Sequence, residues 1–162
     1  MSSWVIYVDI HAEYNFDVAF DLGVWGAKDR DRFIDPGSRK EIGKGDRLCF
    51  VRGINYITPI SSPRSKDDYY NNVDSAEEVI VAEVTTDVFK DYEKIWGDDL
   101  YPYRFKHYIM YSCHKKKIRD VLPEELLEPL RLSMVRNGQA YLFDDDSMEK
   151  LWEAAKDWLD ED

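Results

Sequence analysis

Apolar positions along the chain fall into short stretches that predict strands and helices. Alternating or continuous runs of β-branched and aromatic residues predict strands at 3–10, 47–52, 54–60, 78–86, 103–114 and 140–144. Apolar residues at helical spacing before Gly23 predict a helix over 13–23, and Pro123 opens a second helix over 122–133. The long crossover helices of a parallel sheet are missing, so the pattern indicates an α+β fold, a small mixed β-barrel of about five to six strands flanked by short helices.

The acidic stretch 144–162 carries the clearest helical pattern. Its apolar stripe, which predicts a helix packed on the core, consists of Met148, Leu151, Trp152, Ala155, Trp158 and Leu159. Asp146 and Glu149 have the spacing of a capping box at the start of this helix. In contrast, the segment 53–77 is rich in polar and turn-forming residues and predicts a long insertion loop.

Length and composition suit one domain over residues 1–162. Of the chain, 44% is hydrophobic, 34% charged and 14% aromatic, so it can bury a core and still expose aromatic side chains. It contains no apolar run near 18 residues and no basic segment followed by a long apolar one, so we expect no membrane span and no signal peptide. Cys49 and Cys113 suit buried thiols in the reducing cytoplasm.

The net charge of −11 argues against a nucleic-acid partner, but the charge is unevenly distributed. Residues 28–66 hold ten Lys or Arg against five Asp or Glu, and residues 103–119 hold six Lys or Arg and no acid. The stretch 144–162 holds nine acids and two lysines. One interpretation is a basic face that contacts phosphates, with an acidic back; the other is a set of ordinary solvated faces.

Catalytic and metal-binding patterns are weak. His107, Cys113 and His114 lie close in sequence, but on a strand residues 107 and 113 share a face while 114 points away. No second cysteine pair completes a zinc site, and the aspartates 144–146 fit a helix cap better than a cation site. Cys49 lies within an apolar strand, where thiols are inert. We therefore expect a binding protein that is not an enzyme and has no metal and no cofactor.

Two tryptophans occupy unusual positions. Trp25 lies between Gly23 and Gly26, and Trp96 precedes a glycine and two aspartates, so both are predicted in loops at strand ends. Two indoles that face each other accept a flat ring or a methylated nitrogen. Asn15, ten residues before Trp25, offers an amide that reads the edge of such a ring, although its commoner role is to cap a helix.

These motifs resemble those of the EVE and YTH domains, which belong to the PUA-like group. "GVWG" (23–26) resembles their Val-Trp-small segment, and "IGKGDRLCFV" (42–51) and "VIVAEVT" (79–85) resemble EVE strands. "YPYRF" (101–105) and the stretch 131–152 resemble later EVE segments. Asn15 and Trp25 keep the spacing that YTH domains show between the base-reading asparagine and the first cage tryptophan. Val8 and Asp9 depart from the family's Lys-Ser pair, a phosphate contact.

The resemblance implies a PUA-like mixed β-barrel that captures a flipped, modified base in an aromatic cage. Trp25 and Trp96 would form two walls, Asn15 would read the base edge, and the backbone of Gly26 would accept from the exocyclic amine. A third wall would come from Leu100 or Tyr101. The expected backbone and phosphate contacts are Lys28, Arg30, Arg32, Arg52, Arg64, Lys66 and Arg104.

The leading hypothesis is a reader of a modified base in DNA, and the asparagine spacing favours N6-methyladenine over 5-methylcytosine. The family context suggests a modification-dependent, McrB-like restriction system with a fused or partner AAA+ motor or nuclease. A 5-methylcytosine reader and a PUA-like RNA-binding factor are the open alternatives. A small hydrolase that uses Cys49 or the aspartates is a further one.

Overall fold

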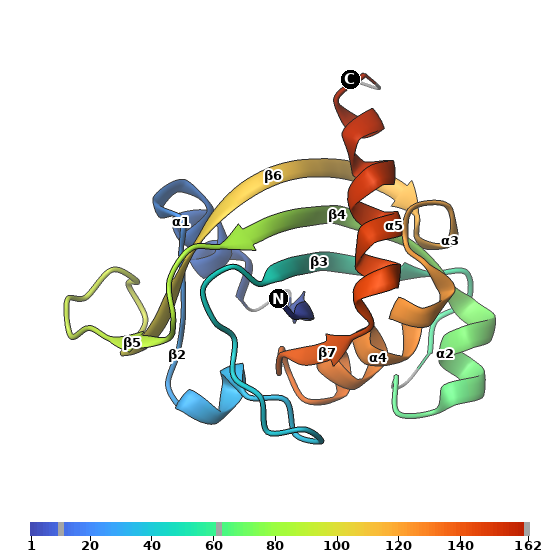
Figure 1. Ribbon diagram of the computed structural model, residues 1–162. Helices are drawn as coiled ribbons and strands as arrows, with labels where there is room; N and C mark the ends of the chain where they lie inside the picture. Colours follow the sequence, from blue (N-terminus) through green and yellow to red (C-terminus); the bar gives the residue numbers. More distant parts are fainter. Residues whose placement is uncertain (10–11, 61–62, 161–162) are drawn as a thin grey trace.

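The structure is a computed structural model that describes residues 1–9, 12–60 and 63–160 (Figure 1). Its strands are β1 (Ser3–Val8), β2 (Val24–Ala27), β3 (Arg47–Tyr56), β4 (Val73–Val84), β5 (Phe89–Lys90), β6 (Tyr103–Lys117) and β7 (Tyr141–Phe143). Its α-helices are α1 (Glu13–Leu22), α2 (Lys66–Asn72), α3 (Ile118–Val121), α4 (Leu127–Val135) and α5 (Asp145–Ala155). Single turns of 3₁₀-helix are η2 (Arg30–Phe33), η3 (Glu124–Leu126) and η4 (Lys156–Asp160).

The described strands form one open mixed sheet rather than a closed barrel. Six strands run in the order β2-β6-β4-β3-β1-β7, and β5 pairs with β6, which makes seven strands instead of the predicted five to six. The strands β1 and β3 are parallel, and the other pairs are antiparallel. The α+β class is confirmed, whereas the predicted closed barrel is wrong, because β2 and β7 at the two ends of the strand order do not pair.

The connection around η2 contacts the segment that leads into β7. The Arg32 carbonyl accepts a hydrogen bond from the Ala140 amide at 3.0 Å. The side chain of Gln139 donates to the carbonyls of Asp31 and Ile34, each at 2.8 Å. These hydrogen bonds attach η2, which follows β2, to the start of β7 at the other end of the strand order.

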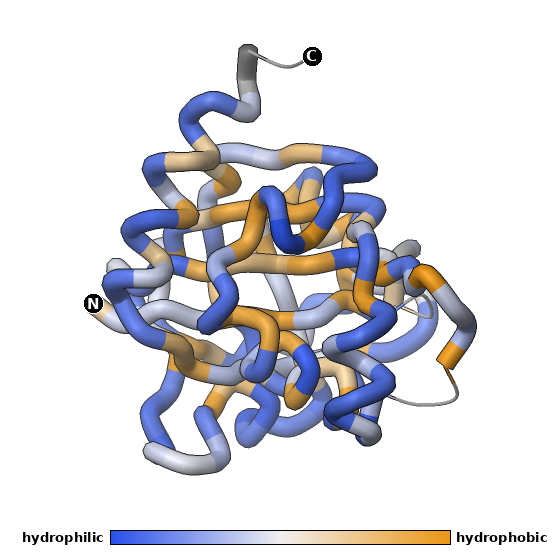
Figure 2. The backbone as a smooth tube through the Cα atoms, turned by 90° about the vertical axis from the view of Figure 1, so that its right-hand side faces the viewer, coloured by the Kyte–Doolittle hydropathy of each residue, from blue (hydrophilic) through white to orange (hydrophobic). Residues whose placement is uncertain are grey.

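Both faces of the sheet are buried, so each strand contributes alternate residues to two cores. In β1, Trp4 and Ile6 point into the core on the concave face, whereas Val5 points into the core under α2–α5. Figure 1 shows these helices together on one side of the sheet, with α1 beside β2 at the other end. Figure 2 shows hydrophobic positions concentrated along the strands. None of the described helices is long and apolar enough to span a membrane.

The helix predicted over 13–23 is confirmed as α1, which ends at Gly23 in the left-handed conformation, with φ at 68°. In this conformation the Gly23 amide reaches the Ala19 carbonyl at 2.7 Å and ends the helix. Two features disfavour any residue with a side chain at position 23. The positive φ is strained for such residues, and a Cβ atom would lie 2.9 Å from the His107 carbonyl oxygen.

The segment 53–77 differs from the predicted insertion loop. The strand β3 continues to Tyr56 past Gly53, which adopts a positive φ of 68°, so the separate strand predicted at 54–60 is wrong. The helix α2 follows, with Ser65 as its N-cap, and β4 begins at Val73. The polar residues here face solvent along a long hairpin, which composition alone does not distinguish from a loop.

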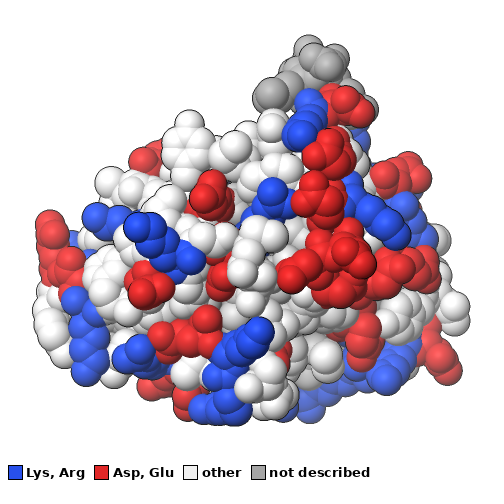
Figure 3. Space-filling model, viewed as in Figure 1, with Lys and Arg blue, Asp and Glu red and all other residues white. Residues whose placement is uncertain are grey.

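The C-terminal helix is confirmed in part. The helix α5 covers 145–155, and η4 continues it to residue 160. Its N-cap is Asp144, whose carboxylate accepts from the Ser147 amide at 2.8 Å, rather than the predicted Asp146. Trp152 and Trp158 are buried as predicted. Figure 3 shows acidic side chains gathered over α5.

Candidate functional site

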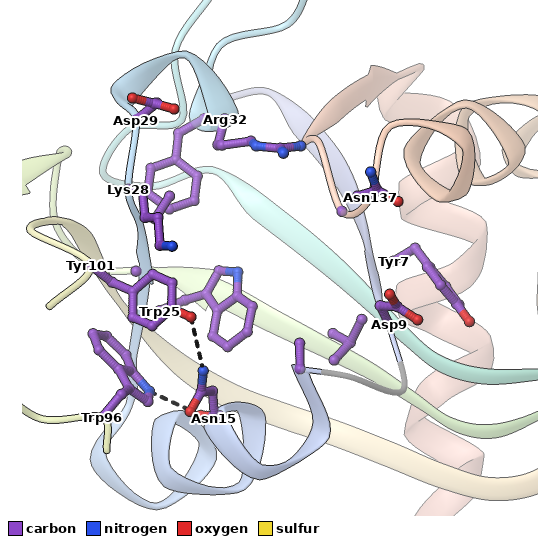
Figure 4. A pocket seen from close by; sticks show the side chains of 16 residues that line it. Tyr7, Asp9, Asn15, Trp25, Lys28, Asp29, Arg32, Trp96, Tyr101 and Asn137 are labelled. Carbon is purple, nitrogen blue, oxygen red and sulfur yellow. Dashed lines mark hydrogen bonds between the residues drawn. The ribbon is translucent and has the colours of Figure 1, made fainter. Parts of the chain in front are cut away.

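A pocket of about 240 Å³ opens at the end of the molecule that carries α1 and β2. Its lining residues are Tyr7, Val8, Asp9, Ala12, Asn15, Trp25, Gly26, Ala27, Lys28, Asp29, Arg32, Phe33, Trp96, Tyr101, Asn137 and Gly138. In Figure 4 the labelled aromatic residues Trp25, Trp96 and Tyr101 lie with Asn15 at one end, and Asp9, Tyr7 and Asn137 lie at the other. The volume is slightly below the lower bound of about 300 Å³ for drug-sized ligands and suits one flat ring.

The Trp25 indole is the more accessible of the two tryptophans. Trp25 lies within the edge strand β2 (Val24–Ala27), so its predicted position in a loop is wrong. The residue is half-buried and lines the pocket. Its ring makes edge contacts with Phe16, at 5.7 Å between centroids, and with Phe50, at 6.1 Å. These contacts fix the plane of the indole and leave part of it facing the pocket, so Trp25 is prepared to stack with a ligand.

Trp96 is held almost entirely within the protein, with 2% of its surface exposed. Its Nε1 donates to the Asn15 carbonyl at 3.0 Å, and the Arg104 guanidinium lies 5.2 Å from its ring centroid. The Tyr101 ring contacts it edge-on at 5.5 Å. Both indoles therefore line one pocket as expected. However, Trp96 exposes too little of its ring to stack against a ligand as a cage wall would.

Gly26 allows Trp96 to approach β2. A Cβ atom at Gly26 would lie 2.6 Å from Cη2 and 2.8 Å from Cζ3 of the Trp96 ring. We expect Gly26→Ala to displace this ring and to lower the free energy of unfolding by about 1–3 kcal/mol, the usual cost of overpacking. Urea denaturation measures the effect. Gly97→Ala is the control, because a Cβ there meets nothing within 4 Å. Equal stabilities of the two variants would contradict the close packing of Trp96 against β2.

The backbone of Gly26 also faces the open edge of the sheet. The Gly23 carbonyl accepts from the His107 amide at 2.9 Å, and Trp25 and Gly26 then pair in register with Phe105 and Arg104. Hydrogen-bonded and non-hydrogen-bonded pairs alternate in an antiparallel ladder, so the N–H and C=O of Gly26 point away from β6. They offer one donor and one acceptor to a ligand in the pocket.

Asn15 does not cap α1, because the N-cap is Ala12 and the Asn15 side chain makes no cap hydrogen bond. Instead its Nδ2 donates to both carboxylate oxygens of Asp98, at 3.0 and 3.1 Å, and to the Tyr101 hydroxyl at 3.3 Å. The Tyr101 hydroxyl in turn donates to Asp98 at 2.6 Å. Hydrogen bonds from Tyr101 and Asn15 lower the pKa of Asp98, while burial and then the Asp98 carboxylate raise the pKa of Tyr101 to about 12.

The predicted phosphate contacts are dispersed. Lys28 and Arg32 line the pocket, and Arg30 borders a neighbouring hollow with Arg32. Lys28 pairs with Asp99 at 2.9 Å, and Arg30 makes a two-point contact with Glu41. A phosphate would therefore have to compete with Asp99 for Lys28 and with Glu41 for Arg30, although such exposed ion pairs are weak. The side chain of Arg32 donates instead to the Arg136 carbonyl at 2.5 Å.

The remaining predicted cations lie away from the pocket. Arg52 pairs with Asp17 and Glu78, and Lys66 lies 3.8 Å from Glu128. Arg64 is exposed, and its carbonyl accepts from Arg131. Leu100, a predicted wall, is absent from the pocket lining.

Arg104 is a correction, since it is 1% exposed and cannot contact a phosphate. Its guanidinium donates to the carbonyls of Glu93, Leu100 and Tyr101. It therefore holds the loop that carries Trp96 and Tyr101, a role that depends on a fold the sequence pattern does not show.

One part of the pocket was missed by the sequence analysis. The described end of β1 contributes Tyr7 and Asp9, and the turn before β7 contributes Asn137 and Gly138. Asn-Gly is a turn signal, and both residues adopt positive φ. This signal locates a turn but does not say that the turn lies beside β1.

The structure also places the residues that the sequence analysis considered for metal binding and catalysis. The described residues contain no group of three or more His, Cys, Asp or Glu that could hold a metal ion. Burial raises the pKa of Cys49 well above its ordinary range, so the thiol stays protonated. The expected shared face of His107 and Cys113 is wrong, because the register of β6 against β4 shifts between Val81 and Ala82 and places the two side chains in different cores.

Comparisons with known proteins give weak likenesses. No protein-family model matches the chain, and no curated protein matches it significantly. Among solved structures, it is similar to a complex of the YTH domain-containing protein Mmi1 with RNA, at 14% identity and a TM-score of 0.49, over 96% of this chain and 83% of that one. It is also similar to a Toxoplasma CPSF4 YTH domain in apo form, at 13% identity and a TM-score of 0.48, over 96% and 87% of the chains.

Proposed function

We propose that this protein binds one flat, modified nucleobase in the pocket between α1, β2 and the 96–101 loop. The observation that carries the proposal is the meeting of a half-buried indole, Trp25, with a fixed amide, Asn15, and an open backbone edge, Gly26, around one ring-sized pocket. The aromatic side chains supply stacking, and the amide and backbone supply groups that read a ring edge.

The base must reach the pocket outside a stacked duplex. Extruding a base costs a few kcal/mol, and stacking on an aromatic side chain returns roughly 1–3 kcal/mol. A buried methyl group adds about 0.8 kcal/mol. A modification that weakens base pairing lowers the extrusion cost, so modified bases are favoured both by the pocket and by the duplex they leave.

N6-methyladenine in DNA is the ligand that we propose first. Its remaining N6 hydrogen is a donor for the Gly26 carbonyl, which points away from β6. The protein would then act as a recognition module of a modification-dependent restriction system, and cleavage would belong to a fused or partner AAA+ motor or nuclease. DNA, this base and this setting come from the resemblance of the sequence motifs.

Binding titrations test this function. Labelled single-stranded and duplex oligonucleotides would carry adenine, N6-methyladenine, cytosine or 5-methylcytosine at one position, in DNA and in RNA, with anisotropy as the signal. We expect the tightest binding for N6-methyladenine in DNA. Preference for RNA or for 5-methylcytosine would replace the proposed ligand, and equal weak binding of every oligonucleotide would reject base reading.

Trp25→Ala is expected to weaken binding of the preferred oligonucleotide about 5- to 150-fold, the loss of one stacking contact of roughly 1–3 kcal/mol. Anisotropy titrations measure the loss. Tyr92→Ala is the control, because Tyr92 is an aromatic residue that is 67% exposed and lies outside the pocket lining. Unchanged affinity in Trp25→Ala would remove Trp25 from the site.

A further inference from the structure

The polar side chains at the aromatic end of the pocket donate their hydrogen bonds to other groups of the protein. Asn15 donates through Nδ2 to Asp98 and Tyr101, Tyr101 donates through its hydroxyl to Asp98, and Trp96 donates through Nε1 to the Asn15 carbonyl. Figure 4 shows Tyr101 and Trp96 bonded to Asn15 from two sides. This arrangement leaves acceptor atoms, and not these donors, for a ligand.

The orientation of the Asn15 amide follows from Asp98. An ionised carboxylate only accepts hydrogen bonds, so the amide must turn its NH₂ group toward Asp98. Hydrogen bonds from Tyr101 and Asn15 keep the pKa of Asp98 below its ordinary value, so the carboxylate stays ionised at neutral pH. Within the described part of the chain, every hydrogen bond of the Asn15 side chain leaves from Nδ2, and Oδ1 remains as an acceptor.

We propose that Asp98 is a positioning residue that makes this pocket select a ring carrying an N–H donor on its edge, by holding Asn15 with Oδ1 available. The inference rests on the proposed function and names the ligand class of the same site. An exocyclic amine with at least one hydrogen satisfies Oδ1 or the Gly26 carbonyl. An amine with two methyl groups, or a purine without an exocyclic group, has no hydrogen to donate and leaves these acceptors unpaired.

Asp99 provides a matched control for Asp98. It is the next residue and carries the same charge, but its carboxylate pairs with Lys28 at 2.9 Å instead of with Asn15. Lys28 is a cation in the pocket lining, 63% exposed at its side chain, so the Asp99 variant also tests whether that cation sets the selectivity. The changes Asp98→Asn and Asp99→Asn remove one charge each and alter volume little.

The experiment compares oligonucleotides that carry N6-methyladenine, N6,N6-dimethyladenine or unsubstituted purine at one position, because the last two have no N–H donor on the ring edge. For the unaltered protein and for Asp99→Asn, we expect the last two to bind at least about tenfold more weakly, since a site built to pair a donor rejects a ligand that lacks it. Asp98→Asn offers Asn15 both a donor and an acceptor, so the amide can turn over. We expect its selectivity to fall to less than about threefold, while N6-methyladenine still binds in a Trp25-dependent way.

The possible outcomes distinguish three claims: base reading by the pocket, selection for an N–H donor, and the positioning role of Asp98. Trp25-dependent binding of N6-methyladenine with equal binding of the dimethyladenine and unsubstituted purine oligonucleotides overturns donor selection but keeps base reading. Selectivity that persists in Asp98→Asn, or that falls equally in Asp99→Asn, overturns the role of Asp98. Absence of Trp25-dependent binding rejects base reading and this inference together. Circular dichroism and urea midpoints of both variants show whether a loss of selectivity accompanies a loss of folding.

Discussion

Trp96→Ala is expected to lower the free energy of unfolding by about 3–5 kcal/mol, the range for deleting a buried aromatic side chain. Trp96 is 2% exposed and contacts Tyr101, Arg104 and Gly26. Its removal leaves a cavity behind the pocket and releases the Asn15 carbonyl from its hydrogen bond. Urea denaturation at neutral pH measures the loss.

Two other variants serve as comparisons for the stability of Trp96→Ala. Trp25→Ala removes an indole of the same size that is only half-buried, so its cost in stability is expected to be smaller. Trp96→Phe keeps most of the apolar volume but removes the Nε1 donor. If Trp96→Ala cost no more than Trp25→Ala, Trp96 would not be an interior residue, and the division between a packed tryptophan and a stacking tryptophan would be rejected.

His107→Leu is expected to remove a large part of the pH dependence of stability. His107 is 5% exposed, packs between Phe50 and Phe105, and has no hydrogen-bond partner for either ring nitrogen. Burial lowers the pKa of His107 from 6.5 to about 4. The unfolded chain therefore takes up a proton in this interval that the folded chain excludes.

The direction of the effect follows from this difference. Stability is complete above pH 6.5 and falls as the pH decreases toward 4. Each pH unit corresponds to about 1.4 kcal/mol, so the total loss is about 3 kcal/mol. Urea denaturation between pH 4.5 and 6.5, the pH range that we choose for the test, should show this slope in the unaltered protein and a flatter one in His107→Leu, by roughly 1.4 kcal/mol per pH unit.

His114→Leu is the control for this measurement, because His114 lies on the same strand, is exposed and pairs with Glu78. Its slope should resemble that of the unaltered protein. An unchanged slope in His107→Leu would show that the imidazole of His107 reaches water or a partner in solution, and the tight packing of Phe50 behind Trp25 would then need revision.

Local signals along the chain identified most of the elements because each depends on neighbouring residues. The spacing of Phe16 and Ala19 before Gly23 was sufficient for α1, and the stripe that includes Trp152 and Trp158 was sufficient for α5. The polar composition of 53–77 predicts a loop, whereas the structure has a hairpin with a helix there. Composition fails here because solvent-exposed strands and solvent-exposed loops contain similar residues.

The grouping of Asn15, Trp25, Gly26, Trp96 and Tyr101 around one pocket agrees with the sequence motifs. Their burial was not predictable, because it depends on elements that lie far apart in the sequence. Arg104 illustrates this dependence on tertiary structure. The sequence pattern predicts a surface cation, whereas in the fold its buried guanidinium donates hydrogen bonds to three loop carbonyls.

The sequence by itself determined the α+β class, most of the strands and the first and last helices, since periodicity and glycine positions are local properties. The residues expected at the pocket came from the resemblance to EVE and YTH motifs, and not from periodicity. Only the tertiary structure decided that the sheet stays open, that Trp96 is packed while Trp25 is accessible, and that Asp98 orients Asn15. The physical reason is that strand closure, burial and hydrogen-bond partners are set by contacts between segments as far apart as residues 15 and 98. No pattern within one segment encodes these contacts.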